Sequence, residues 1–276
     1  MTSVASSRSK AATERGLAAG VSFERTGTGP SLLLIHGLGA TKRIWRPQVE
    51  RLATERDVIA VDMPGFGDSP MLAGPATPWA LAEAVMAACG RLGVERPHVA
   101  GNSLGGWVAL EIAKRDEAAS LCLISPAGLW SKPLGPRSVN TRAVARRLRP
   151  LIGSLVRTRR SREAMLRTTV GRPERIPIPD ARDMIEAWVD APGYDAANEE
   201  MRRYIATDLD RITVPTSIVW GELDRLVRAP RPERRPPDTK FIQVPGIGHT
   251  PNWDDPELIT DFLLEASSAT AATPAA

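Results

Sequence analysis

The chain has 276 residues, of which 42% are hydrophobic and 25% are charged, and its formal net charge is +4. This length supports a substantial core, and the composition excludes wholesale disorder. Only two cysteines are present, Cys89 and Cys122, which excludes a disulfide scaffold and makes a reducing cytoplasm the simplest expectation. We expect neither a secretory signal nor a transmembrane segment, because the apolar runs are all short.

Short apolar runs alternate with longer helical patterns along most of the chain. The runs that predict strands are 21–25, 31–35, 58–61, 98–100, 120–124, 216–220 and 240–244. The stretches that predict helices are 41–56, 78–92, 103–114 and 256–265. Alternation of this kind is typical of an α/β fold with a largely parallel sheet covered on both faces. Residues 15–19 are poor strand formers, so we expect a short edge there.

The alternation stops between residues 129 and 211. Apolar side chains recur there at helical spacing, at Val144, Leu148, Leu151, Ile152 and Leu155. Pro150 should break or kink that helix, and 183–189 and 198–206 also look helical. We therefore predict a core of residues 17–128 and 212–266, a helical cap at 129–211, and flexible tails at 1–16 and 267–276.

Basic residues are concentrated in the predicted cap. Between residues 132 and 175 there are 13 Lys and Arg against Glu163 and Glu174, a net charge of +11. The simplest interpretation is a solvated arginine-rich face, because no aromatic side chains interleave with the basic ones as nucleic-acid binding would favour. We expect no nucleic-acid partner. Weak electrostatic contact with an acidic partner or a membrane surface stays open, and the oligomeric state is not predicted.

The strongest local signal is the sequence Gly101-Asn102-Ser103-Leu104-Gly105-Gly106, between a predicted strand and a predicted helix. A serine in so tight a turn has a strained backbone, and glycines on both sides avoid collisions. The turn also directs free N–H groups at the start of the helix towards the serine oxygen. The pattern predicts that Ser103 is a nucleophile. The alternative is a glycine-rich turn with an incidental serine.

A serine nucleophile needs a base and a carboxylate that orients it. His36 directly follows a buried strand and His98 begins one, whereas His249 lies in a turn after the last strand. We therefore predict His249 as the base, with a surface-loop histidine as the alternative. Asp224 follows the strand at 216–220 and is the predicted partner of His249. Glu222 is the competing carboxylate.

Two further sets of residues complete the predicted site. The backbone N–H groups of Leu38 and Leu104 would form the oxyanion hole, which leaves His36 with a structural role. Trp130, Trp107 and Asn102 are candidates to line the pocket, with core packing as the alternative for both tryptophans.

We predict no cofactor and no metal, because no phosphate-binding glycine pattern is present and three histidines leave little room for a metal-binding cluster.

Together these motifs resemble the α/β-hydrolase superfamily over residues 21–265. The matching motifs are 36–39, 62–69, 101–106, 221–224 and 246–249. The resemblance implies an eight-stranded, mostly parallel sheet, a helical cap inserted at 129–211, and a Ser103–His249–Asp224 triad. A serine at position 103 is unlike the aspartate nucleophile of haloalkane dehalogenases and epoxide hydrolases.

The expected activity is hydrolysis of a small-to-medium carboxylic ester, thioester or lactone through an acyl-enzyme on Ser103. Asn102, Gly105 and Gly106 also resemble hydrolases that cleave carbon–carbon bonds in meta-cleavage products, but no cap arginine matches the carboxylate-binding position of that branch. Carbon–carbon hydrolysis or acyl transfer on the same triad therefore stays an alternative. A non-catalytic ligand-binding protein on a hydrolase scaffold is a third.

Overall fold

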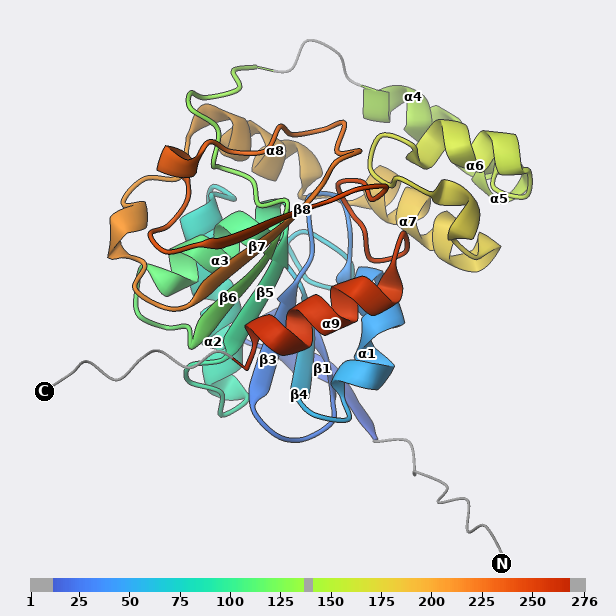
Figure 1. Ribbon diagram of the computed structural model, residues 1–276. Helices are drawn as coiled ribbons and strands as arrows, with labels where there is room; N and C mark the ends of the chain where they lie inside the picture. Colours follow the sequence, from blue (N-terminus) through green and yellow to red (C-terminus); the bar gives the residue numbers. More distant parts are fainter. Residues whose placement is uncertain (1–11, 137–140, 269–276) are drawn as a thin grey trace, which may run out of the picture.

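A single eight-stranded sheet forms the centre of the protein (Figure 1). The computed structural model describes residues 12–136 and 141–268. The strand order is β1-β2-β4-β3-β5-β6-β7-β8, and β2 alone runs against the other seven. The strands are β1 Thr13–Ala18, β2 Val21–Thr26, β3 Ser31–Ile35, β4 Asp57–Asp62, β5 His98–Asn102, β6 Ser120–Ile124, β7 Thr216–Gly221 and β8 Lys240–Val244. The predicted mostly parallel sheet is confirmed.

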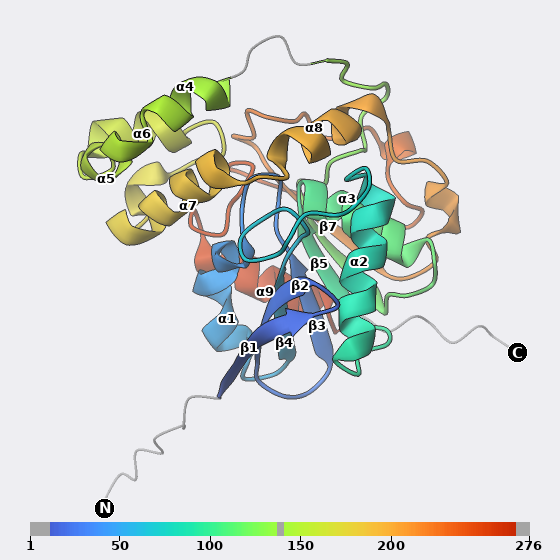
Figure 2. The same cartoon turned by 180° about the vertical axis from the view of Figure 1, so that it is seen from behind.

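Helices cover both faces of the sheet (Figures 1 and 2). On one face lie α1 (Arg46–Leu52) and α9 (Pro256–Ala266), and on the other lie α2 (Pro78–Arg91) and α3 (Leu104–Ala113). Successive strand residues point to opposite faces. Leu33 and Ile35 therefore join the core under α2 and α3, while Leu32 and Leu34 join the core under α1 and α9. This explains why the strands are continuous apolar runs.

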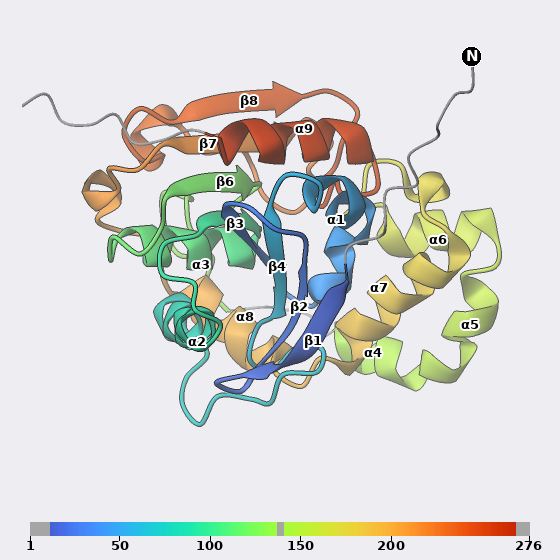
Figure 3. The same ribbon diagram turned by 90° about the horizontal axis from the view of Figure 1, so that it is seen from below.

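The chain between β6 and β7 forms a group of helices, here called the helical insertion (residues 129–211). Its helices are α4 Thr141–Arg147, α5 Ile152–Leu155, α6 Arg159–Leu166, α7 Ile178–Asp190 and α8 Tyr194–Arg203. Between α4 and α5, residues Arg149–Leu151 form a short 3₁₀ turn around Pro150. The insertion has its own apolar cluster, which includes Ile152, Val156 and Ile185. Figure 3 shows α4, α5 and α6 at one end of the molecule, with α7 between them and the sheet.

The edges of the core differ from the sequence-based expectation. The predicted tail reaches residue 16, but β1 begins at Thr13 and pairs with β2 along its whole length, so the expected short edge is wrong. Backbone pairing outweighs the weak strand preference of these residues. Ser267 was expected in a tail, yet its hydroxyl accepts a hydrogen bond from Arg56. Residues 1–11 and 269–276 of the predicted tails lie outside the described residues.

No helix in the described ranges combines the length and the apolar content that crossing a bilayer requires.

Candidate active site

Ser103 occupies the turn between β5 and α3. Its backbone has φ 53°, a left-handed conformation that costs a non-glycine residue energy and is concentrated at functional sites. A Cβ on Gly101 would lie 2.3 Å from the Gly105 carbonyl oxygen, and a Cβ on Gly105 would lie 2.3 Å from that of Ile35. Only glycine therefore fits on either side of the turn. Ser103 is half-buried and therefore partly accessible to solvent.

His249 and Asp224 are paired. The distance from His249 Nδ1 to Asp224 Oδ2 is 2.7 Å, and both side chains are nearly inaccessible to solvent. The backbone N–H groups of Leu226 and Val227 donate to the other oxygen, Asp224 Oδ1. Burial alone would raise the pKa of Asp224, but the hydrogen bond with His249 and the backbone donors outweigh it and lower that pKa. The competing carboxylate, Glu222, is exposed.

Asn102 connects the two parts of the predicted triad. Its Nδ2 donates to the carbonyl oxygens of His249 (2.9 Å) and Ile124 (3.1 Å), and its Oδ1 accepts from Thr250 Oγ1 (3.3 Å). Because Asn102 precedes Ser103 directly, these bonds hold the backbone of His249 beside the serine turn. Asn102 was predicted to line the pocket, but its amide is buried and occupied by these bonds.

The loop that carries His249, residues 246–254 and here called the His249 loop, is also bonded to the helical insertion. The buried carboxylate of Asp254 accepts from the backbone N–H groups of Gly248 (2.7 Å), Gly171 (2.9 Å) and Arg172 (2.6 Å). Burial raises the pKa of Asp254, against the effect of these donors. Thr250 N–H donates to Thr169 in the same segment. The sequence analysis missed Asp254, because two of its three backbone partners lie about 80 residues away.

The segment after β3 passes alongside Ser103. A Cβ on Gly37 would lie 3.2 Å from Ser103 Cβ and 3.1 Å from Asn102 Oδ1. Leu38, predicted to supply an oxyanion-hole N–H, follows Gly37 and is half-buried. Leu104, the other predicted donor, is the first residue of α3, where backbone N–H groups have no partner within the helix.

His36 has a structural environment. It is fully buried, its Nε2 accepts from Met63 N–H at 3.0 Å, and its Nδ1 lies 2.8 Å from the Gly37 carbonyl oxygen. An acceptor at Nε2 leaves the proton on Nδ1, which is the neutral form. Burial lowers the pKa of His36, which favours that form further.

The two tryptophans proposed for the pocket pack against each other edge to face, with ring centroids 5.6 Å apart. Trp107 is fully buried and its Nε1 donates to Glu111. Trp130 is half-buried and its Nε1 donates to the Tyr204 carbonyl oxygen. Trp107 is therefore a core residue, the alternative given above, while Trp130 contacts the segment after α8.

A buried ion pair that the sequence analysis also missed lies at the end of β4. Lys42 Nζ is 2.6 Å from Asp62 Oδ2 and 3.0 Å from Asp68, and Lys42 N–H donates to Asp62 Oδ1. Burial alone would lower the pKa of Lys42, but the two carboxylates raise it. The pair fixes the turn after β4. An isolated lysine in a predicted helix gives no sequence signal of such a contact.

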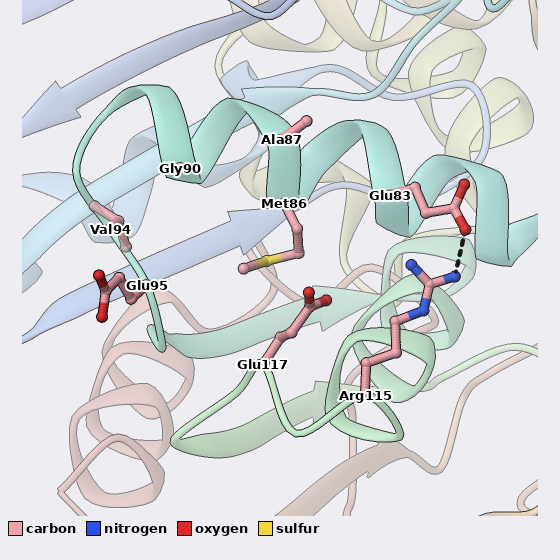
Figure 4. Close-up of a pocket in the computed structure, with 8 residues that line it drawn as sticks. All are labelled: Glu83, Met86, Ala87, Gly90, Val94, Glu95, Arg115 and Glu117. Carbon is pink, nitrogen blue, oxygen red and sulfur yellow. Dashed lines mark hydrogen bonds and ion pairs between the residues drawn. The ribbon is translucent and has the colours of Figure 1, made fainter.

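Two hollows of the described structure are not lined by Ser103. The larger, about 420 Å³ in volume, is drawn in Figure 4 and lies between α2 and the segments that precede β5 and follow α3. It is therefore at the opposite end of α3 from Ser103. The smaller hollow, about 180 Å³ in volume, is lined by Asp62, Asp68 and residues of α7.

Residues 12–136 and 141–268 contain no group of three or more side chains suited to binding a metal ion.

Comparison with known proteins places these features in a family. Residues 32–262 match the model of the alpha/beta hydrolase family. The chain is 30% identical over 252 residues to the dihydrolipoyllysine-residue acetyltransferase component of the acetoin cleaving system of Pseudomonas putida, covering 88% of this chain but only 65% of that protein.

Two solved structures are also similar. One is a bacterial membrane phospholipase A, with 28% identity, a TM-score of 0.73, and coverage of 94% of this chain and 88% of that one. The other is a thermophilic esterase from Thermogutta terrifontis, with 27% identity, a TM-score of 0.68, and coverage of 91% and 97%.

Proposed function

The chain belongs to the alpha/beta hydrolase family, and from that premise we propose that it is a serine hydrolase of carboxylic esters, thioesters or lactones. One observation carries the proposal. The buried Asp224–His249 pair is fastened, through Asn102, beside a serine whose backbone is held at φ 53°. The similarity to the Thermogutta terrifontis esterase supports the substrate class.

The proposed reaction begins with proton transfer. His249 takes the proton of Ser103 as Oγ attacks the ester carbonyl, and Asp224 stabilises the imidazolium that forms. The lowered pKa of Asp224 keeps this carboxylate ionised at neutral pH. The backbone N–H groups of Leu38 and Leu104 bind the oxyanion.

The second half of the reaction uses the same groups. His249 returns its proton to the leaving group, which departs and leaves an acyl group on Ser103. The imidazole then activates a water molecule that releases the acid. In this proposal the helical insertion acts as a cap, and Trp130 lies on the side of the acyl pocket next to it.

The test is hydrolysis of p-nitrophenyl esters of graded acyl length. We expect Ser103→Ala to lower kcat by about 10⁶-fold. We expect Asp224→Asn to lower kcat by about 10⁴-fold, because an amide holds the imidazole in the wrong tautomer. Glu222→Gln is the matched control at the exposed carboxylate two residues away, and it should keep wild-type activity.

A fluorophosphonate probe tests the nucleophile directly. Mass spectrometry should find the adduct on Ser103 of the wild-type protein and no adduct on Ser103→Ala. Full ester hydrolysis by Ser103→Ala, or loss of activity in Glu222→Gln together with normal activity in Asp224→Asn, would contradict the proposed roles.

A further inference from the structure

The outer surface of α4 and α5 carries a row of exposed aliphatic side chains, here called the outer row. Val144, Leu148, Leu151 and Leu155 are 58%, 45%, 53% and 36% exposed. They follow one another at intervals of four, three and four residues, which places them along one side of the two helices and the 3₁₀ turn. Two other apolar residues of the same stretch, Ile152 and Val156, are instead buried in the apolar cluster that includes residues of α7.

Basic side chains accompany the outer row. Residues 141–162 include eight arginines and no acidic residue. Some of the arginines are neutralised by other elements, as Arg149 is by Asp190. In the described part of the chain, the guanidinium groups of Arg147, Arg157 and Arg160 have no acidic partner. Arg147 lies three residues after Val144 and four before Leu151, so it shares their side of the helix.

We propose that the outer row and Arg147, Arg157 and Arg160 form a docking surface for an anionic lipid bilayer. The exposed aliphatic side chains, with Arg147 beside them and the exposed Arg157 and Arg160 a few residues further along the chain, match the acyl and headgroup layers of such a bilayer. The surface lies at one end of the molecule, on helices that α7 separates from the sheet (Figures 1 and 3). Its residues line neither of the two hollows described above.

The test uses the full-length wild-type protein in vesicle co-flotation, and its readout is independent of ester hydrolysis. We expect binding to vesicles of phosphatidylcholine with phosphatidylglycerol and much weaker binding to phosphatidylcholine alone. Added salt should weaken the binding, because exposed charges are screened. Equal binding to both vesicles, or binding to neither, would overturn the proposal.

Two variants separate the apolar and basic contributions. We expect the double variant Leu148→Ser/Leu151→Ser and the triple variant Arg147→Gln/Arg157→Gln/Arg160→Gln each to lower partitioning onto the anionic vesicles by about tenfold or more. Leu17→Ser and Arg91→Gln are controls at exposed positions of β1 and α2, and they should bind as the wild-type protein does. Circular dichroism checks that each variant is folded.

Two other occupants give different results. If a second copy of the chain covers the outer row, size-exclusion chromatography will show a dimer that Leu148→Ser/Leu151→Ser dissociates, and vesicle binding will be absent. If an acidic protein is the partner, the wild-type protein will bind poly-L-glutamate. The variant Leu148→Ser/Leu151→Ser will then bind both poly-L-glutamate and the anionic vesicles as the wild type does. Either result would contradict lipid docking.

Discussion

The His249 loop and the outer helices α4 and α5 are held in place in opposite ways. The His249 loop is bonded on both sides, to Asn102 in the core and to Gly171 and Arg172 in the helical insertion. The outer helices pack on one side only and leave four aliphatic side chains in solvent. A segment bonded on two sides has few alternative positions, which suits a group that must meet a serine. A segment packed on one side keeps a free surface, which suits contact with a partner.

The largest expected effect on stability breaks the packed side of the outer helices. Ile152→Ala removes a buried side chain from the small cluster of the insertion, and we expect it to lower the free energy of unfolding by about 2–5 kcal/mol. Its neighbour Leu151 is 53% exposed, so Leu151→Ala should change that free energy by less than about 0.5 kcal/mol. Urea unfolding measures the free energy of unfolding of both variants. Equal losses would show that buried and exposed positions of the outer helices do not differ in their contribution to stability.

Much of this difference could not be predicted from the sequence. Periodicity indicated a helix through Val144, Leu148, Leu151, Ile152 and Leu155, but both sides of it are apolar. Which side packs depends on where α7 lies. The places of Ser103, Asp224 and His249 after β5, β7 and β8 were predictable from the apolar runs that precede them, and their catalytic roles stay a prediction. The hydrogen bonds of Asp254 were not predictable, because two of its three backbone donors come from a segment about 80 residues earlier.

The strands show the same limit. Buried runs such as 31–35 were predicted with the observed bounds, since a strand covered on both faces is apolar throughout. Edge strand β1 was underestimated, because its side chains are mostly exposed and its order comes from backbone pairing with β2. The composition of a single strand does not reveal whether another strand pairs with it.

A smaller effect is expected where the His249 loop meets β7. A Cβ on Gly221 would lie 2.4 Å from the carbonyl oxygens of Ile247 and Gly248, so Gly221→Ala must displace the loop. We expect kcat on p-nitrophenyl esters to fall by about 100-fold, equivalent to about 2.7 kcal/mol, because the imidazole moves away from Ser103.

Gly90→Ala is the matched control for this variant. Apart from Gly90 itself, its chain neighbours and the backbone of its own helix α2, no described atom lies within 4 Å of a Cβ built at this position. Alanine there should leave kcat unchanged and raise the free energy of unfolding by about 0.5–1 kcal/mol. Wild-type kcat in Gly221→Ala would mean that the contact with β7 does not position the His249 loop.

The smallest expected effect distinguishes the two buried carboxylates that hold the His249 loop. The pKa of Asp224 is lowered, so its contribution to stability is present above its ordinary pKa and is lost as the pH falls through the lowered value. Burial raises the pKa of Asp254, so its contribution to stability is present below the ordinary pKa and is lost as the pH rises through the raised value.

Urea unfolding of wild type, Asp224→Asn and Asp254→Asn across the acidic range measures both contributions to stability. The wild type should gain stability relative to Asp224→Asn as the pH rises, and lose stability relative to Asp254→Asn. The sign of each pH dependence carries the result, because either amide also changes stability at every pH. The same sign for both variants would contradict the opposite pKa directions of the two aspartates, lowered by hydrogen bonds at Asp224 and raised by burial at Asp254.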